Sequence, residues 1–270
     1  MAPQPLAPKH LRRRLIGWAA ARRGVRRRDG FEEEVDFWRD YLDKHHASVS
    51  DRRLWVAAFP PDLRRWTELL AAGTPELEAL ELGSGPVSLL AWGVDHGLFR
   101  LTAVDPLANE YATLMEAHGW SYPVTPIRED GENLSKLFGA DRFDLAYASN
   151  ALDHTRAPRR CIEEIAKVVR AGGLVYCEGF VREGTNAGWS GLHQHDLVPE
   201  NGHLVRYDQR ARRAVLTEGL GLECLQQKVQ PFIERGLTSH GYEWSGEKGR
   251  DWRYDHWFTL VWQVKDRSRG

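Results

Sequence analysis

The sequence is poor in cysteine, has no long apolar run and carries almost no charge imbalance. The three cysteines, Cys161, Cys177 and Cys224, cannot all pair and lack the spacing of a metal site, so we expect buried thiols in a reducing cytoplasm. No stretch approaches the roughly 18 apolar residues of a membrane-spanning helix, and we expect no signal peptide. A formal net charge of −1 gives no electrostatic case for a nucleic-acid or membrane partner.

The 270 residues are enough for one large α/β domain with additions. The stretch at residues 79–88 organises the chain. Its short apolar run, Leu80 to Leu82, predicts a buried strand, which Gly83 and Gly85 end before a helix begins. Glycines at such a turn let a ligand lie directly on the main chain, and the free amides of the helix favour an electron-rich group.

A second short strand at residues 101–105 ends in Asp105. A glycine turn followed by an acid at the end of the next strand is how α/β folds hold a ribose. Together, Glu81-Leu-Gly83-Ser-Gly85 and Asp105 resemble the class I S-adenosylmethionine (SAM)-dependent methyltransferases, whose first motif is acid-x-Gly-x-Gly-x-Gly. Here Val87 replaces the third glycine. The resemblance continues in order through three further stretches and covers about residues 76–180.

The resemblance implies SAM as the cofactor and assigns its site. The residues expected to bind it are Glu81, Gly83, Ser84, Gly85, Asp105, Pro106, Asp130, Gly131, Ser149 and Asn150. Residues 129–134 resemble the family's adenine loop, in which Asp130 would accept from the amino group and Gly131 would meet the ring. An alternative is that these acids simply favour a helix N-terminus.

A strand at residues 143–150 runs out into Ala151-Leu-Asp-His154, which is similar to the family's fourth motif. Ligands of open sheets lie beyond the carboxyl ends of the strands, so topology alone places Ser149, Asn150 and His154 near the site. A histidine at this position in the family often packs near the transferred methyl. The alternative is a histidine that caps a loop.

The long loop at residues 181–206 contains His193-Gln-His195-Asp196. This pattern suits a general base with an orienting carboxylate, or ordinary loop hydrogen bonds; a metal is the weaker idea, because no cysteine or second histidine pair accompanies it. An oxygen or nitrogen acceptor has to lose a proton, which a histidine of near-neutral pKa can take. The candidates are His154, His193 and His195, and we expect no metal.

Alternating elements predict a Rossmann-like α/β fold: a seven-stranded, mostly parallel sheet in the order 3-2-1-4-5-7-6, with helices on both faces. The third strand is expected at 123–128, and the fifth to seventh at 173–180, 222–229 and 257–264. Helices are expected at 31–42, 54–70, 109–118, 156–170 (stopped by Gly172-Gly173) and 207–220. Residues 1–75 would form a helical extension or lid, with Trp38, Trp55 and Trp66 near the acceptor, and residues 76–270 the SAM-binding domain.

Three functions remain open. The first is transfer of the SAM methyl to oxygen or nitrogen of a small molecule. The second is a different SAM-using reaction on the same fold, in which another carbon beside sulfur is attacked. The third is a non-catalytic module that binds a partner through its basic N-terminus (residues 1–30). We expect a cytoplasmic protein with a small-molecule substrate, and we consider a homodimer.

Overall fold

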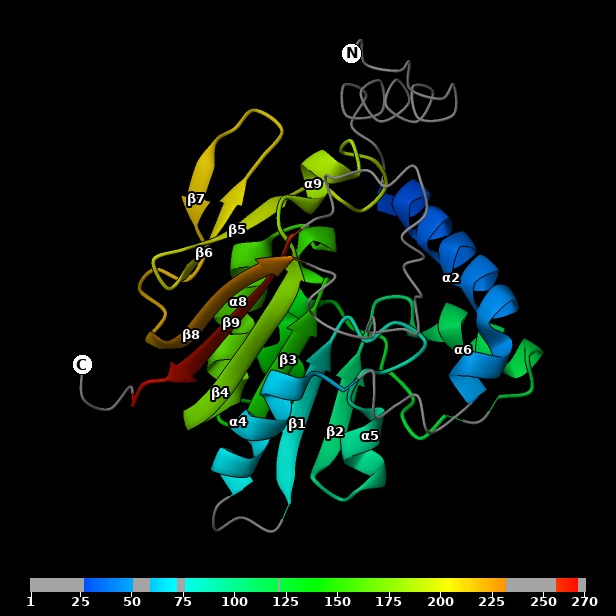
Figure 1. Cartoon of the computed structure of the whole chain (residues 1–270), viewed down its shortest axis with the longest axis horizontal. Coiled ribbons are helices and arrows are strands. Elements are labelled where there is room, and N and C mark those ends of the chain that lie inside the picture. The colour runs from blue at the N-terminus through cyan, green and yellow to red at the C-terminus, as the bar shows by residue number, and fades with distance from the viewer. Residues whose placement is uncertain (1–26, 51–58, 72–75, 121, 232–255, 267–270) are drawn as a thin grey trace.

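The computed structural model describes residues 27–50, 59–71, 76–120, 122–231 and 256–266. Within these residues, six strands form one sheet in the order β2-β1-β3-β4-β9-β8 (Figure 1). The strands are β1 (Leu77–Leu82), β2 (Phe99–Val104), β3 (Phe143–Ser149), β4 (Val169–Phe180), β8 (Leu222–Pro231) and β9 (His256–Val264). The first four pair in parallel, whereas β9 is antiparallel to both β4 and β8.

The mostly parallel Rossmann-like sheet was expected, but its strand count was not. Residues 123–128 do not form a full third strand: their only strand-like pairing in the described part of the chain is a parallel bridge between Val104 and Ile127. Pro123 and Pro126 lie within this segment and have no amide hydrogen to donate to a ladder. The final pair behaves as predicted, because the last strand lies antiparallel between β4 and β8.

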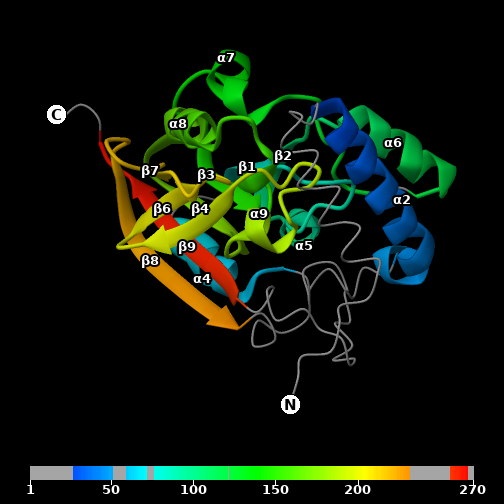
Figure 2. The same ribbon diagram turned by 90° about the horizontal axis from the view of Figure 1, so that it is seen from above.

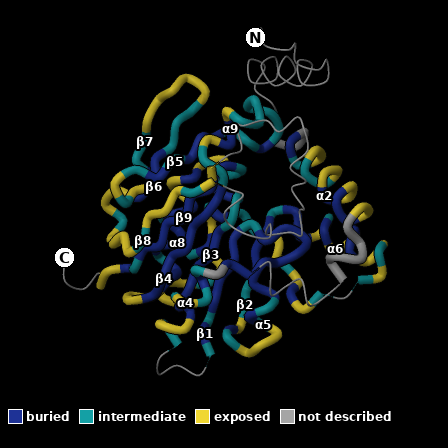
Figure 3. The backbone as a smooth tube through the Cα atoms, in the orientation of Figure 1, coloured by how far each residue is buried: buried dark blue, intermediate teal, exposed yellow. Residues whose placement is uncertain are grey.

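Helices cover both faces of the sheet (Figure 2). One face carries α7 (Leu134–Phe138) and α8 (Pro158–Val168), and the other carries α4 (Pro61–Ala71) and α5 (Ala91–Asp95). Beyond β2 lie α6 (Ala108–Ala117) and the N-terminal helix α2 (Arg27–Ser50). The central strand β3 is therefore buried on both faces, with only its last residue half-exposed, as its mostly apolar sequence predicts (Figure 3).

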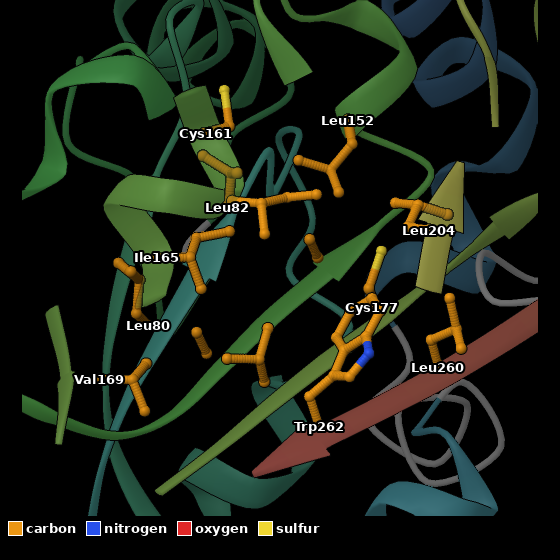
Figure 4. Close-up of a cluster of buried hydrophobic side chains, with 14 of the residues drawn as sticks. Leu80, Leu82, Leu152, Cys161, Ile165, Val169, Cys177, Leu204, Leu260 and Trp262 are labelled. Atoms are coloured by element: carbon orange, nitrogen blue, oxygen red, sulfur yellow. The ribbon is translucent and has the colours of Figure 1, made fainter. Parts of the chain in front are cut away.

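Alternate residues of the strands feed two separate cores. Leu80, Leu82, Ala148 and Cys177 face α8 in one cluster, which also includes Trp262 of β9 (Figure 4). Tyr147 and Tyr176 face α4 and α5 in the other. Cys161 and Cys177 are buried as expected, whereas Cys224 is exposed, because β8 is an edge strand.

The predicted helix at 207–220 is wrong. These residues form the end of β6 (His203–Tyr207), a turn, and β7 (Arg213–Val215). In a small antiparallel sheet, β6 pairs with β5 (Asp196–Glu200) on one side and with β7 on the other. The turn forms because the Asp208 carboxylate accepts the amides of Arg210 and Arg212 at 2.9 and 3.0 Å, a competitor to helix formation. The expected loop at 181–206 is accordingly shorter, and it also contains α9 (Glu183–Asn186).

Several helix boundaries also differ. Helix α8 ends at Val168 rather than at Gly172-Gly173, because Val169 already pairs with Phe143 as the start of β4. Helix α2 is longer than the predicted 31–42, and α4 begins at Pro61, with Trp55 outside the described residues. Most of the basic arm, residues 1–26, also lies outside them. Among the helices that are described, none has the length and apolar character to cross a bilayer.

Candidate cofactor and catalytic site

The glycine turn after β1 is held tightly between two neighbouring strands. The Gly83 amide donates to the Val104 carbonyl at 2.8 Å, and Gly83 has a φ of +66°. A Cβ at this position would lie 2.4 Å from the Cβ of Ala151, which follows β3. Only glycine fits here, and the turn is consequently in direct contact with the segment that leads to His154.

The buried carboxylate of Glu81 stabilises the chain that follows this turn. It is 2% exposed, and its carboxylate accepts the Ser88 hydroxyl and, at 3.2 Å, the Leu89 amide. Burial raises the pKa of Glu81 to about 8, against the opposing effect of the two donors. Ser84 is also buried, and its hydroxyl donates to the Gly85 carbonyl at 3.1 Å. Both side chains are thus engaged in building the loop.

Asp105 follows the last residue of β2 and faces the same turn. Its two oxygens accept the Gly85 amide at 3.1 Å and the Leu107 amide at 2.8 Å. Burial raises the pKa of Asp105 to about 7, although both donors oppose the shift. Pro106 is half-buried beside it. The predicted ribose acid is therefore in contact with the glycine turn.

Helix α2 closes over the turn. A Cβ built at Gly85, whose φ is +60°, would lie 2.9 Å from the Trp38 ring. Trp38 is 7% exposed, its indole nitrogen donates to Glu34 at 2.9 Å, and its ring packs edge-on to Tyr111 of α6. The expected aromatic of the N-terminal extension consequently lies against the cofactor loop itself.

The predicted adenine loop lies beside the same strand end. Gly131 is buried, and a Cβ there would be 2.8 Å from a methyl carbon of Leu82. Asp130 is partly exposed and pairs with Arg156 at 3.2 Å. Leu82 therefore connects the adenine loop to the end of β1.

Ser149 and Asn150 end β3 next to a buried carboxylate on β4. Glu178 is 2% exposed and accepts the Tyr147 hydroxyl at 2.6 Å, the Ser149 hydroxyl at 3.2 Å and the Trp257 indole N–H at 3.2 Å. Asn150 has a φ of +47°, and its side-chain oxygen accepts the Phe180 amide at 3.2 Å. Both predicted residues thus lie at the carboxyl ends of the strands.

Two of the three candidate histidines come together. His154 Nε2 lies 3.0 Å from His193 Nδ1, and Asp153 Oδ2 lies 2.9 Å from His193 Nδ1 and 3.4 Å from His154 Nε2. Asp153 is 2% exposed. Burial alone would raise the pKa of Asp153, but the charge of His154 and the hydrogen bond of His193 lower it below its usual value.

A second carboxylate approaches this cluster from α9. Glu183 Oε1 lies 3.8 Å from His193 Nδ1, and Oε2 is buried with no hydrogen-bond partner. Burial, opposed by His193, raises the pKa of Glu183 to about 7. His195 is separate: its Nε2 lies 3.0 Å from the Thr155 carbonyl, and burial together with Arg206 lowers its pKa.

Three carboxylates of the site were not predicted from the sequence. Asp153 precedes His154 directly, and Glu178 is a charged residue inside an otherwise apolar strand, which is a signal that the sequence carries. Glu183 gives no such signal, because its position depends on how α9 folds back. Asp196 of the expected His193-Gln-His195-Asp196 group instead accepts the Thr185 amide and hydroxyl, at 2.7 and 2.6 Å.

Comparison with known proteins places this geometry in a family. Residues 80–177 match the model described as "Methyltransferase domain", which spans both the glycine turn and the Asp153-His154 segment. This part of the chain, residues 80–177, is therefore a class I SAM-dependent methyltransferase domain. SAM is accordingly its cofactor, and methyl transfer is its class of reaction.

Similar proteins agree with this assignment. Over 179 residues, the chain is 27% identical to demethylmenaquinone methyltransferases of Mycobacterium bovis and Mycobacterium tuberculosis, covering 65% of this chain and 72% of those enzymes. Among solved structures, it resembles a chain of the complex between the Haloferax volcanii Trm112 methyltransferase activator and a methyltransferase, with a TM-score of 0.53 and 16% identity. That match covers 87% of this chain and 97% of the other, and it supports the fold.

Proposed function

We propose that this methyltransferase transfers the SAM methyl to an oxygen or nitrogen of a small molecule, and that the histidine cluster assists removal of the acceptor's proton. The observation that carries the proposal is the convergence of Asp153, His154 and His193 directly after the segment that touches the glycine turn. Such a cluster beside the cofactor loop is where an acceptor would meet the methyl.

In this proposal the cofactor lies across the carboxyl ends of β1, β2 and β3. The Gly83–Gly85 turn lies against SAM. Asp105 accepts hydrogen bonds from the ribose hydroxyls, and Asp130 with Gly131 holds the adenine. Ser149 and Asn150 border the methionine end, while Glu81 and Ser84 keep the turn in shape. Pro106 supports the turn after Asp105. This arrangement follows the rule that ligands of open α/β sheets bind beyond the carboxyl ends of the strands.

The SAM methyl is already activated by the sulfonium, so the protein has to orient the acceptor and exclude water. Orientation alone can supply effective molarities of about 10⁵–10⁸ M. We propose that residues 1–75 act as a cover for this purpose, because Trp38 packs on Gly85. The boundary with the SAM-binding part, residues 76–270, falls just before β1. We also propose a cytoplasmic location, which the free cysteines Cys161, Cys177 and Cys224 support, because thiols stay reduced there.

The test is a methyl-transfer assay over a panel of hydroxyl- and amine-bearing small molecules, with S-adenosylhomocysteine measured by mass spectrometry. Demethylmenaquinone, whose quinone ring bears no hydroxyl or amine, is tested separately, because the mycobacterial relatives are named for it. We expect His193→Gln to slow transfer by about 10²–10⁴-fold without changing SAM affinity, the usual range for loss of proton-transfer assistance. His203→Gln, whose ring contacts Thr217 in the small sheet, is the control.

The products distinguish the other two functions. Cleavage of SAM to methylthioadenosine in place of S-adenosylhomocysteine would show that another carbon beside sulfur is attacked. Tight SAM binding with no turnover of any acceptor would favour the non-catalytic module. Unchanged transfer rates in His193→Gln and His154→Gln would show that the histidine cluster takes no part in the reaction.

A further inference from the structure

The side chains around His193 have more electron-pair donors than protons to share. Three atoms, Asp153 Oδ2, His154 Nε2 and His193 Nδ1, lie 2.9–3.4 Å from one another. A neutral imidazole carries one N–H, so His193 Nδ1 can donate to either Asp153 or His154 but not to both. A cation at the centre would satisfy all three lone pairs at once.

The separations match those of metal ligands. In a tetrahedral zinc site with bonds of about 2.0–2.1 Å, neighbouring ligand atoms lie about 3.3 Å apart. The three observed separations, 2.9, 3.0 and 3.4 Å, define a triangle that has points about 2 Å from every corner. The backbone therefore already holds these three side chains close to the spacing that coordination requires.

A second carboxylate, that of Glu183, lies next to this group. Glu183 is 5% exposed, its Oε1 lies 3.8 Å from His193 Nδ1, and its buried Oε2 has no hydrogen-bond partner. A buried carboxylate oxygen that accepts no hydrogen bond is costly unless a nearby charge offsets it. Two carboxylates, Asp153 and Glu183, would neutralise a divalent ion, and two imidazoles with carboxylates form a donor set suited to zinc and other first-row metals.

We propose that Asp153, His154 and His193 form a divalent transition-metal site, of the zinc type, beside the methyl-transfer site, with Glu183 next to them and the fourth position open to the acceptor. This inference rests on the proposed function and specifies how the histidine cluster assists it. A hydroxyl of the acceptor that coordinates the ion has a lowered pKa and loses its proton to water. Its oxygen then forms the new C–O bond while the C–S bond of SAM breaks, which gives S-adenosylhomocysteine.

The test is calorimetric titration of the full chain, freed of metal by chelation, with zinc chloride. We expect one zinc ion whose affinity falls at least 10-fold in His193→Gln and in Asp153→Asn. The control His203→Gln should bind as the wild type does. Because the chain has eleven histidines, the difference between these variants, rather than binding alone, is the measure.

Cobalt provides a second readout that does not depend on activity. Co²⁺ in the wild-type protein should show the visible absorption of a tetrahedral site, and His154→Gln should lose it. If any of these variants fails to fold, Glu183→Gln, which keeps the shape of the side chain, replaces it.

Zinc affinity and cobalt spectra that do not differ between the wild type and the cluster variants would overturn the metal site. In that case, retained SAM binding and methyl transfer would leave the proposed function standing with His154 and His193 as direct proton acceptors. A wild-type protein that does not bind SAM would instead refute the proposed function, whatever the result of the metal titration.

Discussion

Replacement of Gly83 by alanine tests how closely the cofactor turn is fitted to the strand beside it. An L-residue in the left-handed region costs about 1–2 kcal/mol. The added Cβ would also lie 2.4 Å from the Ala151 Cβ, and overpacking of this kind costs about 1–3 kcal/mol more. We therefore expect Gly83→Ala to lower the free energy of unfolding by about 2–5 kcal/mol.

Two further variants separate the two contributions. Gly97 has a φ of +67° but nothing within 4 Å of a built Cβ, so Gly97→Ala should cost only the backbone strain of about 1–2 kcal/mol. Ala151→Gly, added to Gly83→Ala, should recover the part of the free energy of unfolding that is lost to overpacking. Urea unfolding followed by tryptophan fluorescence gives these values in a double-mutant cycle. Equal losses for Gly83→Ala and Gly97→Ala, with no coupling to Ala151, would refute the contact.

Two other predictions concern Glu81, whose carboxylate holds the glycine turn, and Trp38 of α2, whose ring packs on that turn. Glu81 has a folded-state pKa of about 8 against an ordinary value of 4.5, so the folded state holds an extra proton between these values and stability falls as pH rises through this range. Glu81→Gln should flatten this pH dependence in urea unfolding, and an unchanged slope would contradict the assignment. Trp38→Ala should cost about 3–5 kcal/mol, because a buried ring is removed, and it should also weaken SAM binding. Phe37→Ala on the exposed side of α2 should cost about 1 kcal/mol or less, and a similar loss in both variants would argue against the packing of Trp38 on the turn.

The sheet could be predicted because its strands are short apolar runs that end in glycine or polar residues. The runs that became β1 and β3 are buried on both faces, and the glycines after β1 adopt the positive φ that the turn needs. The segment at residues 123–128, which follows β2 and α6, was harder to predict. Its prolines leave one bridge at Ile127 where a full strand was expected. Local composition therefore predicts the central strands better than it predicts the segment beyond β2, at the edge of the sheet.

The catalytic cluster could be predicted only in part, because its members are far apart in the chain. His154 and His193 are 39 residues apart, and they meet because α9 and the segment after it fold back over the end of β3. Spacing within the sequence instead paired His193 with His195, whose ring contacts the Thr155 carbonyl. The predicted helix at 207–220 was wrong for a local reason, because the Asp208 carboxylate closes a turn that lets β7 pair with β6.

The most direct test of the central claim is calorimetric titration of the purified protein with SAM, S-adenosylhomocysteine and NAD, with Asp105→Ala in parallel. We expect both adenosyl ligands to bind at one site and NAD not to bind. Asp105→Ala should lose most of the affinity, because the carboxylate that would hold the ribose is gone. Binding of NAD in preference to SAM, or adenosyl binding that is unaffected in Asp105→Ala, would contradict the assignment of the cofactor site.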